Sequence, residues 1–208
     1  FLDILNTGKT LLQATIDRFH EFIPLENIFI VTNSEYSELI LEQHPNLPQE
    51  NILPEPLGRN TAPCIAYAIQ RIKKRSSKAT MVVAPSDHFI KESNIFAANV
   101  EKAMDFASQH DELITLGIQP TRPDTGYGYI QMMEEQQING FHKVKTFTEK
   151  PNLELAMEFI SSGEFLWNAG IFIWSIKSIE KAFQEYLPEI YQSFTDKYES
   201  FGEPEEKA

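Results

Sequence analysis

The sequence predicts an α/β domain built around a parallel sheet, and two observations carry that prediction. Short apolar runs typical of buried parallel strands alternate with stretches whose apolar residues recur at helical spacing. The order of strand, helix, strand and helix along the first half of the chain favours a parallel sheet with crossover helices. The 208 residues, 42% of them hydrophobic, suffice for one large domain or a domain with a small appendage.

The first half of the chain supplies the elements of this sheet in order. Apolar residues at helical spacing predict a helix over residues 11–19. Ser34 is a candidate N-cap for a helix that runs to residue 43. The remaining segments are strands at 27–32, 52–53, 80–84 and 112–117, and helices at 62–75 and 94–109.

Beyond Gly126 the pattern becomes closer to that of alternating strands. Residues 127–132 and 142–147 alternate between apolar and polar side chains, and a polar turn at 134–140 separates them. A helix at 153–161, a strongly apolar run at 165–174 and a helix at 176–186 follow. The acidic end of the chain, residues 199–208, is expected to be exposed.

Composition and charge exclude several classes of protein. The net charge of −12 should repel a polyanion, so we expect no nucleic-acid partner. No segment approaches the ~20 apolar residues that a membrane span needs. The one cysteine, Cys64, allows no internal disulfide and no multi-cysteine metal site. These features indicate a cytoplasmic protein. A small anionic substrate remains compatible with basic residues near the polar clusters described below, namely Arg59, Arg122, Lys145 and Lys150.

The stretch from Glu55 to Pro63 joins a tight turn to a helix. Asn60 or Thr61 can serve as the N-cap, and Pro63 lies near the first helical turn. Free backbone N–H groups and the positive end of the helix dipole favour an anion or the edge of a nucleotide base. For a lone segment, a capped helix is the simpler interpretation. Three further polar clusters beside expected strands favour a ligand site.

Asp87 follows an apolar run and a Pro-Ser turn. It therefore lies at the carboxyl end of a buried strand, where ligands of open α/β sheets bind. A carboxylate there can hold Mg²⁺, a hard cation that takes oxygen ligands and keeps phosphates in its coordination shell. The alternative is an aspartate that caps the following turn. The position at the strand end favours the metal.

Three later clusters offer groups for a sugar and its phosphate. Tyr127 could stack on a sugar, and Gly128 permits close backbone approach. Glu149 can accept two sugar hydroxyls and Lys150 can meet a phosphate as a point charge, although a solvated turn is the alternative. Asn168 is a lone amide in an apolar run, so it needs partners, either from a ligand or from the backbone at a bulge.

Taken in order, these motifs resemble the mannose-1-phosphate guanylyltransferase (GDP-mannose pyrophosphorylase) family of the bacterial type. The resemblance covers essentially the whole chain. It implies a single Rossmann-like nucleotidyltransferase domain, residues 1–208, with helices on both faces of a mostly parallel central sheet. The motifs are Glu55-Pro-x-Gly-Arg-Asn-Thr-Ala-Pro63, Pro85-Ser-Asp-His-x-Ile90, Gly126-Tyr-Gly-Tyr-Ile130, Phe147-x-Glu-Lys-Pro151 and Trp167-Asn-Ala-Gly-Ile-Phe172.

The resemblance implies that mannose 1-phosphate and GTP react to give GDP-mannose and pyrophosphate, with Mg²⁺ as cofactor. In-line attack of the sugar phosphate on the α-phosphorus makes catalysis a matter of positioning and charge neutralisation. The implied catalytic residues are Asp87, which is also the metal ligand, and Lys150. The implied nucleotide-binding residues are Glu55, Pro56, Gly58, Arg59, Asn60 and Thr61, and the sugar-phosphate-binding residues are Tyr127, Gly128, Glu149, Lys150 and Asn168.

The chain departs from the family's pattern at both ends. The signature Gly-Gly-x-Gly-x-Arg loop, which ends Pro-Lys-Gln-Phe, is missing, and Phe1 stands in the place of its last residue. The later segment with a second metal-binding aspartate is missing too. We therefore expect a domain truncated at both ends and, as a fragment, inactive. The alternatives are a nucleotidyltransferase for another base or sugar, and a catalytically silent sugar-nucleotide-binding homologue. A homodimer is a possible assembly.

Overall fold

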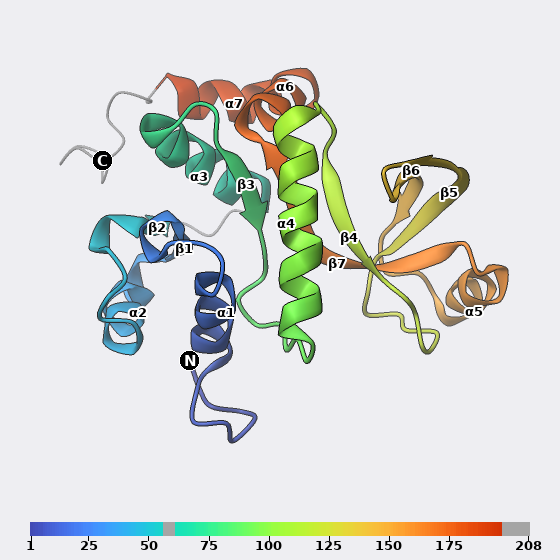
Figure 1. Ribbon diagram of the computed structural model, residues 1–208, viewed down its shortest axis with the longest axis horizontal. Coiled ribbons are helices and arrows are strands. Elements are labelled where there is room, and N and C mark those ends of the chain that lie inside the picture. Colours follow the sequence, from blue (N-terminus) through green and yellow to red (C-terminus); the bar gives the residue numbers. More distant parts are fainter. Residues whose placement is uncertain (56–60, 197–208) are drawn as a thin grey trace. The chain divides into compact units, whose positions relative to one another are not determined.

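The computed structural model describes residues 1–55 and 61–196 (Figure 1). In the described ranges, every helix is too short or too polar to span a lipid bilayer. The α-helices are α1 (Leu11–His20), α2 (Ser37–Gln43), α3 (Thr61–Arg75), α4 (Ser93–Gln109), α5 (Leu153–Ser162), α6 (Ile176–Tyr186) and α7 (Pro188–Thr195). The strands are β1 (Ile30–Asn33), β2 (Ile52–Glu55), β3 (Thr80–Val83), β4 (Ile114–Ile118), β5 (Tyr129–Ile138), β6 (Phe141–Thr148) and β7 (Phe165–Ser175).

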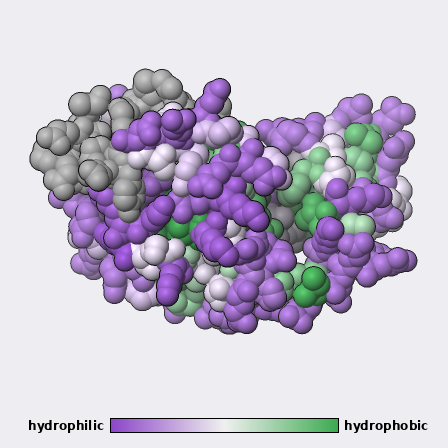
Figure 2. All heavy atoms as spheres, turned by 90° about the horizontal axis from the view of Figure 1, so that it is seen from above, coloured by the Kyte–Doolittle hydropathy of each residue, from purple (hydrophilic) through white to green (hydrophobic). Residues whose placement is uncertain are grey.

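The chain divides into two compact units. Unit 1 combines Phe1–Leu113 with the segment that starts at Ile173, and unit 2 is Ile114–Phe172. Whether they form one truncated nucleotidyltransferase domain stays a prediction. The molecular face shown in Figure 2 is mostly hydrophilic, with small apolar areas, as the charge of −12 leads one to expect.

Unit 1 contains the elements that the helical and apolar patterns predicted in the first half of the chain. β1 and β2 form a parallel pair that runs from Ile30 opposite Ile52 to Asn33 opposite Glu55. α4 packs on β3 and contacts α1, and α3 contacts α6 and α7. The predicted helices over α1, α3, α4 and α6 are therefore confirmed to within a residue or two at each end.

A capping box defines where α1 begins. The Thr10 hydroxyl accepts a hydrogen bond from the backbone N–H of Gln13 at 3.2 Å, and the Gln13 side chain accepts one from the N–H of Thr10 at 2.9 Å. The same two side chains bond to Gln43 at the end of α2. The reciprocal bonds satisfy N–H groups that a helix start leaves open, and they tie α1 to α2.

The predicted helix that starts at Ser34 is wrong in its first turn. Residues 34–36 form a 3-10 turn, and α2 begins only at Ser37. The cap is Asn33, whose side chain accepts from the N–H of Glu35 at 3.0 Å. Asparagine at the strand end supplies that acceptor, so the chain turns one residue before the predicted cap. Pro24 precedes a second 3-10 turn, Leu25–Asn27, and this turn delays β1 to Ile30.

Unit 2 contains antiparallel strands and one helix. β5 pairs antiparallel with β6 and with β7, and β4 also pairs with β7. The turn between β5 and β6 is the dipeptide Asn139-Gly140, whose φ angles are 53° and 84°. Positive φ at both positions suits the tight turns that join hairpin strands, so β5 continues through most of the predicted 134–140 turn.

The expectation of a mostly parallel central sheet is not confirmed. The five-stranded sheet has the order β3-β7-β5-β6 with β4 beside β7, and its β5–β6 and β5–β7 pairs are antiparallel. The parallel β1–β2 pair forms a separate two-stranded sheet. The antiparallel pairing of β5 and β6 follows from the two-residue connection between them. Two residues can join only antiparallel neighbours, whereas parallel strands need a crossover of a dozen or more residues.

Candidate functional site

The predicted site residues fall into two groups, one in each unit. Glu55, Thr61 and Asp87 belong to unit 1. The second group belongs to unit 2 and consists of Tyr127, Gly128, Glu149, Lys150 and Asn168. The predicted nucleotide-binding residues Pro56, Gly58, Arg59 and Asn60 lie outside the described residues.

Gly128, Glu149 and Asn168 converge at one point of unit 2. The backbone N–H of Asn168 donates to the carbonyl of Gly128 at 2.8 Å, which fixes β7 beside the start of β5. A Cβ on Gly128 would lie 3.5 Å from Oε2 of Glu149, 3.5 Å from the carbonyl of Thr148 and 3.7 Å from Cβ of Asn168. Glycine at this position therefore leaves a small open space between a carboxylate and an amide side chain.

The Asn168 side chain is bonded on one side only. Its Oδ1 accepts from the backbone N–H of Gly170 at 3.0 Å and lies 3.4 Å from the hydroxyl of Thr115, which also donates to the Ile171 carbonyl at 3.1 Å. Nδ2 has no hydrogen-bond acceptor among the residues that the structure describes. The backbone thus satisfies the side-chain oxygen of Asn168, as one of the two predicted alternatives required. The two N–H donors of Nδ2 remain available to a ligand.

Glu149 and Lys150 are exposed neighbours at the end of β6. Nζ of Lys150 lies 3.6 Å from Oε1 of Glu149, and the two side chains are 62% and 78% exposed respectively. An exposed pair of this kind contributes ~0–1 kcal/mol, so either side chain can turn towards a ligand at little cost. The φ of Lys150 is 25°. Backbone in that region costs ~1–3 kcal/mol and is concentrated at functional sites.

Asp124 shapes the loop that carries Tyr127, a role that sequence reasoning missed. Its carboxylate accepts from the N–H of Gly126 at 2.8 Å and from Nη2 of Arg122 at 2.6 Å, and these bonds lower the pKa of Asp124. The Tyr127 ring lies 5.1 Å from that of Trp167. The Asp-x-Gly spacing of an Asx-turn was the available signal. Arg122 is thus paired with Asp124.

In unit 1, Glu55 and Thr61 mark the two ends of the segment outside the described residues. Glu55 ends β2, and burial raises the pKa of its carboxyl group. Thr61 is the first residue of α3. Burial, together with the charge of Glu55, raises the pKa of the Cys64 thiol from 9.0 to about 11. Because the thiolate is the reactive form of cysteine, the raised pKa makes Cys64 a poor nucleophile.

Asp87 lies in an anchored loop after β3. On one side the carbonyl of Ser86 accepts from the Thr15 hydroxyl at 3.3 Å, and on the other the carbonyl of His88 accepts from Nη2 of Arg18 at 3.4 Å. Asp87 itself is exposed. Its carboxylate accepts no hydrogen bond from the described residues, so the structure offers no support for the turn-cap alternative.

The residues present fit a magnesium ion with few protein ligands. No group of three or more His, Cys, Asp or Glu side chains that could hold a metal occurs in residues 1–55 and 61–196. Mg²⁺ at nucleotide sites is bound through one or two carboxylates, with waters and substrate phosphates completing its shell. The exposed, unpartnered carboxylate of Asp87 matches that requirement as one ligand.

The family model and the curated relative that match this chain are both nucleotidyltransferases. The family model described as nucleotidyl transferase matches residues 2–204. A mannose-1-phosphate guanylyltransferase from Escherichia coli is 36% identical over 193 residues, which are 89% of this chain and 41% of that protein. The chain thus spans about two fifths of the length of this curated relative.

Two solved structures are similar in fold. A mannose-1-phosphate geranyltransferase from Thermus thermophilus superposes with a TM-score of 0.82 at 28% identity, over 91% of this chain and 54% of that one. A mannose-6-phosphate isomerase from Helicobacter pylori has a TM-score of 0.78 at 30% identity, over 92% of this chain and 72% of that one. They confirm the α/β nucleotidyltransferase fold. With the match of the family model over residues 2–204, they show that the chain belongs to the nucleotidyl transferase family.

Proposed function

We propose that the protein containing this chain is a mannose-1-phosphate guanylyltransferase, which makes GDP-mannose and pyrophosphate from mannose 1-phosphate and GTP. The family match and the name of the Escherichia coli relative support the proposal. The observation that carries it is the convergence of Gly128, Glu149 and Asn168, with Lys150 beside them.

This cluster has the chemistry that a sugar 1-phosphate requires. The Glu149 carboxylate accepts hydroxyl protons, and the Nδ2 group of Asn168 donates to a hydroxyl oxygen. Gly128 admits the sugar ring against the backbone, and Tyr127 offers an aromatic face. Lys150 supplies a positive charge for the phosphate. Directional hydrogen bonds thus select the sugar, while the charge binds the group that all sugar phosphates share.

The nucleotide is proposed to bind at the segment from Glu55 to Thr61. The start of α3 provides backbone donors and the positive end of a helix dipole. Glu55, Pro56, Gly58, Arg59, Asn60 and Thr61 are the residues proposed to contact guanine and ribose.

Asp87 is proposed to hold Mg²⁺. When bound, the ion neutralises charge on the phosphates. The chain's own residues bind and orient the two substrates, because in-line phosphoryl transfer depends mainly on positioning and on neutralising charge.

The proposal also covers the location, domain organisation and assembly of the protein. We propose a cytoplasmic enzyme whose two units together form one nucleotidyltransferase domain, part of a longer protein. Sedimentation equilibrium of the encoded full-length protein distinguishes a monomer from a homodimer.

Nucleotide preference tests the proposed function. The encoded full-length protein should bind GTP and GDP-mannose at least ~100-fold more tightly than UTP, dTTP or CTP, because a site that hydrogen-bonds a polar base edge rejects bases that leave its groups unpaired. Calorimetric titration measures the constants. Equal or tighter binding of another nucleotide would mean a different base, and no nucleotide binding at all would mean a silent homologue.

Two substitutions separate sugar recognition from phosphate recognition. Lys150→Met should raise the KM for mannose 1-phosphate while leaving GTP affinity nearly unchanged, because it removes only a charge. Glu149→Gln keeps the shape but weakens the acceptor, so it should blur discrimination between mannose 1-phosphate and its epimers. If steady-state kinetics show neither change, the end of β6 is only a solvated turn.

A further inference from the structure

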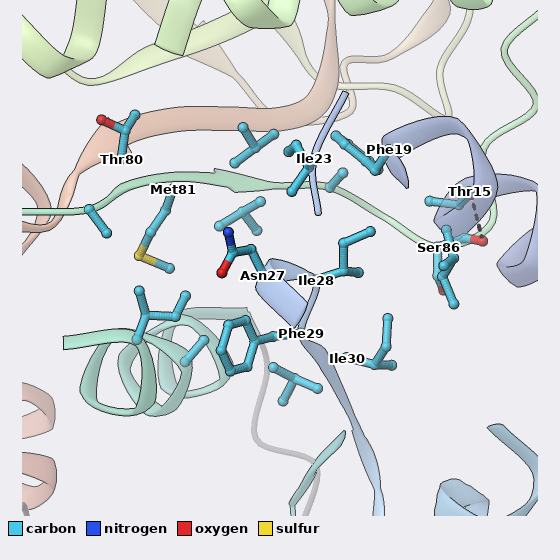
Figure 3. A pocket seen from close by; sticks show the side chains of 18 of the residues that line it. Thr15, Phe19, Ile23, Asn27, Ile28, Phe29, Ile30, Thr80, Met81 and Ser86 are labelled. Atoms are coloured by element: carbon cyan, nitrogen blue, oxygen red, sulfur yellow. Dashed lines mark hydrogen bonds between the residues drawn. The ribbon is translucent and has the colours of Figure 1, made fainter. Parts of the chain in front are cut away.

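The largest cavity described in unit 1 is a poor match for a sugar (Figure 3). Its volume is about 600 Å³ and its lining is mainly apolar. At one end the Thr15 hydroxyl donates to the Ser86 carbonyl at 3.3 Å, so these two groups are already paired. A ligand rich in hydroxyl groups needs several directional polar partners. The groups that suit a sugar are instead those of unit 2, and their binding depends on what holds them in place.

One residue of β5 lies directly behind the candidate sugar site. Tyr129 pairs with Thr148 of β6 on one side and with Trp167 of β7 on the other, both antiparallel. In antiparallel pairs, a step back along one strand is a step forward along its neighbour. The next positions of the three chains are therefore the site residues Gly128, Glu149 and Asn168. Tyr129 is the central residue of the row that supports them.

The ring of Tyr129 is part of the core of unit 2. It is fully buried, and it packs with Ala156 and Phe159 of α5 and with Phe165. Its ring centroid lies 5.2 Å from that of Phe159. Close packing of this kind fixes where the ring lies, and therefore where its hydroxyl points. A phenol hydroxyl in such surroundings requires hydrogen-bond partners.

The hydroxyl of Tyr129 finds both of its partners on one loop residue. It accepts from the backbone N–H of Asp124 at 3.1 Å and donates to the backbone carbonyl of Asp124 at 2.9 Å. The Asp124 carboxylate in turn accepts from the N–H of Gly126 at 2.8 Å, one residue before Tyr127. The loop therefore cannot move away from β5 without breaking both bonds to the hydroxyl.

We propose that Tyr129 is a positioning residue of the candidate sugar site: its hydroxyl holds the 122–127 loop beside Gly128, so that Tyr127 flanks the bound sugar. The assignment of a sugar as the ligand rests on the proposed function.

The packing around Tyr129 separates the role of its ring from that of its hydroxyl. The core of unit 2 requires an aromatic ring at this position, and a phenylalanine supplies one. The pairing of β5 with β7 is held by backbone bonds, among them the one from the Asn168 N–H to the Gly128 carbonyl at 2.8 Å. Loss of the hydroxyl should therefore release the loop and leave the core and the strand pairs in place.

Amide hydrogen exchange of the encoded full-length protein, without substrate, tests this separation. In Tyr129→Phe, exchange at Gly126 and Tyr127 should accelerate at least ~10-fold, since each net hydrogen bond changes an opening equilibrium roughly fivefold. Exchange at the Asn168 N–H should stay as slow as in the unaltered protein. Acceleration at all three amides, or at none, would overturn the proposal.

Steady-state kinetics test the consequence for the site. Tyr129→Phe should raise the KM for mannose 1-phosphate at least ~5-fold, because the loop must be ordered again when the sugar binds. The KM for GTP and kcat should stay within about twofold, which is the pattern of a lost contribution to binding of one substrate. An unchanged KM for mannose 1-phosphate would assign Tyr129 to the core alone.

Ala156→Gly is the matched control for a weakened core. Ala156 is fully buried in the same cluster, and glycine within α5 lowers Tm without touching the hydroxyl of Tyr129. Its KM for mannose 1-phosphate should stay within about twofold of the unaltered protein. A rise equal to that of Tyr129→Phe would trace both effects to the core and overturn the proposal.

The unaltered protein keeps this test apart from that of the proposed function. If it does not turn over mannose 1-phosphate and GTP, the proposed function fails, and the sugar assignment of Tyr129 fails with it. If it does turn over both substrates and Tyr129→Phe keeps the same kinetic constants, only the positioning role of Tyr129 is refuted.

Discussion

At the scale of single residues, the candidate sugar site depends on the absence of a side chain at Gly128. The distances from a Cβ built there, 3.5 Å to the nearest side-chain and backbone oxygens, are ordinary van der Waals contacts. An alanine therefore fits without displacing Glu149 or Asn168. It would nevertheless occupy the space between their polar groups.

Gly128→Ala should consequently separate binding from stability. We expect a change of less than ~1 kcal/mol in the free energy of unfolding, and an increase of at least ~10-fold in the KM for mannose 1-phosphate, because one methyl group in a fitted site is worth ~1–3 kcal/mol. Chemical denaturation and steady-state kinetics of the encoded full-length protein measure the two effects. An unchanged KM would remove Gly128 from the sugar site.

Cys64 provides a second test at this scale. Its thiol pKa is raised to about 11 by burial and by Glu55. The raised pKa means that the folded state favours the neutral thiol of Cys64. The stability that this thiol contributes is therefore present below pH 9 and is lost as the pH rises from 9 to 11. At pH 8 the folded chain should react with iodoacetamide at least ~100-fold more slowly than the urea-unfolded chain, since thiolate is the reactive form. Similar rates would mean an accessible, ordinary thiol.

At the scale of elements, β4 and β7 are held together by a close approach at Gly117. A Cβ on Gly117 would lie 2.9 Å from Cβ and 3.2 Å from Cγ of Leu166, and closer still to Cδ1. The sequence pattern identified Gly117 only as the end of a strand. The pairing of β4 with β7 gives this glycine its steric role, because only a residue without a side chain lets Leu166 pack there.

Gly117→Ala should therefore destabilise the protein by ~1–3 kcal/mol through overpacking. Leu166→Ala in the same chain should recover part of that loss, because it removes the atoms with which the new methyl group collides. Urea denaturation of the two single variants and the double variant gives the coupling energy. Strict additivity of the two substitutions would show that the contact is not the cause.

At the scale of the whole molecule, Asp87 combines a fixed loop with a free carboxylate. Hydrogen bonds from Thr15 and Arg18 hold the loop on both sides of it, and neither uses the Asp87 side chain. The side chain can therefore change without loss of the loop. Its proposed role is tested in the encoded full-length protein with both proposed substrates.

Asp87→Asn should leave Tm and GTP affinity nearly unchanged in the encoded full-length protein and lower kcat at least ~100-fold, because metal charge stabilisation is worth several kcal/mol. Asp105→Asn, at an exposed position of α4, is the matched control and should keep full activity. Near-normal turnover of the Asp87 variant would assign this residue to the turn alone.

The sequence by itself determined the positions of most helices and strands, and it predicted the residues of the candidate sugar site. Helical periodicity is a local property, since residues three and four apart share a face, so α6 was predicted at its observed bounds. Gly128, Glu149 and Asn168 were each identified as polar or glycine positions beside strands. Their convergence at one point appeared only in the folded unit.

The tertiary structure alone decided which strands pair and which neighbours complete the site. The β5–β6 pair is antiparallel because Asn139-Gly140 closes a hairpin, and the length of β5 follows from that turn. Only the structure showed that Thr115 contacts Asn168 and that Asp124 accepts a hydrogen bond from the N–H of Gly126. Strand pairing and such contacts join residues that lie far apart in the sequence. Which of these residues meet is decided by packing across the whole unit, and no local sequence pattern encodes it.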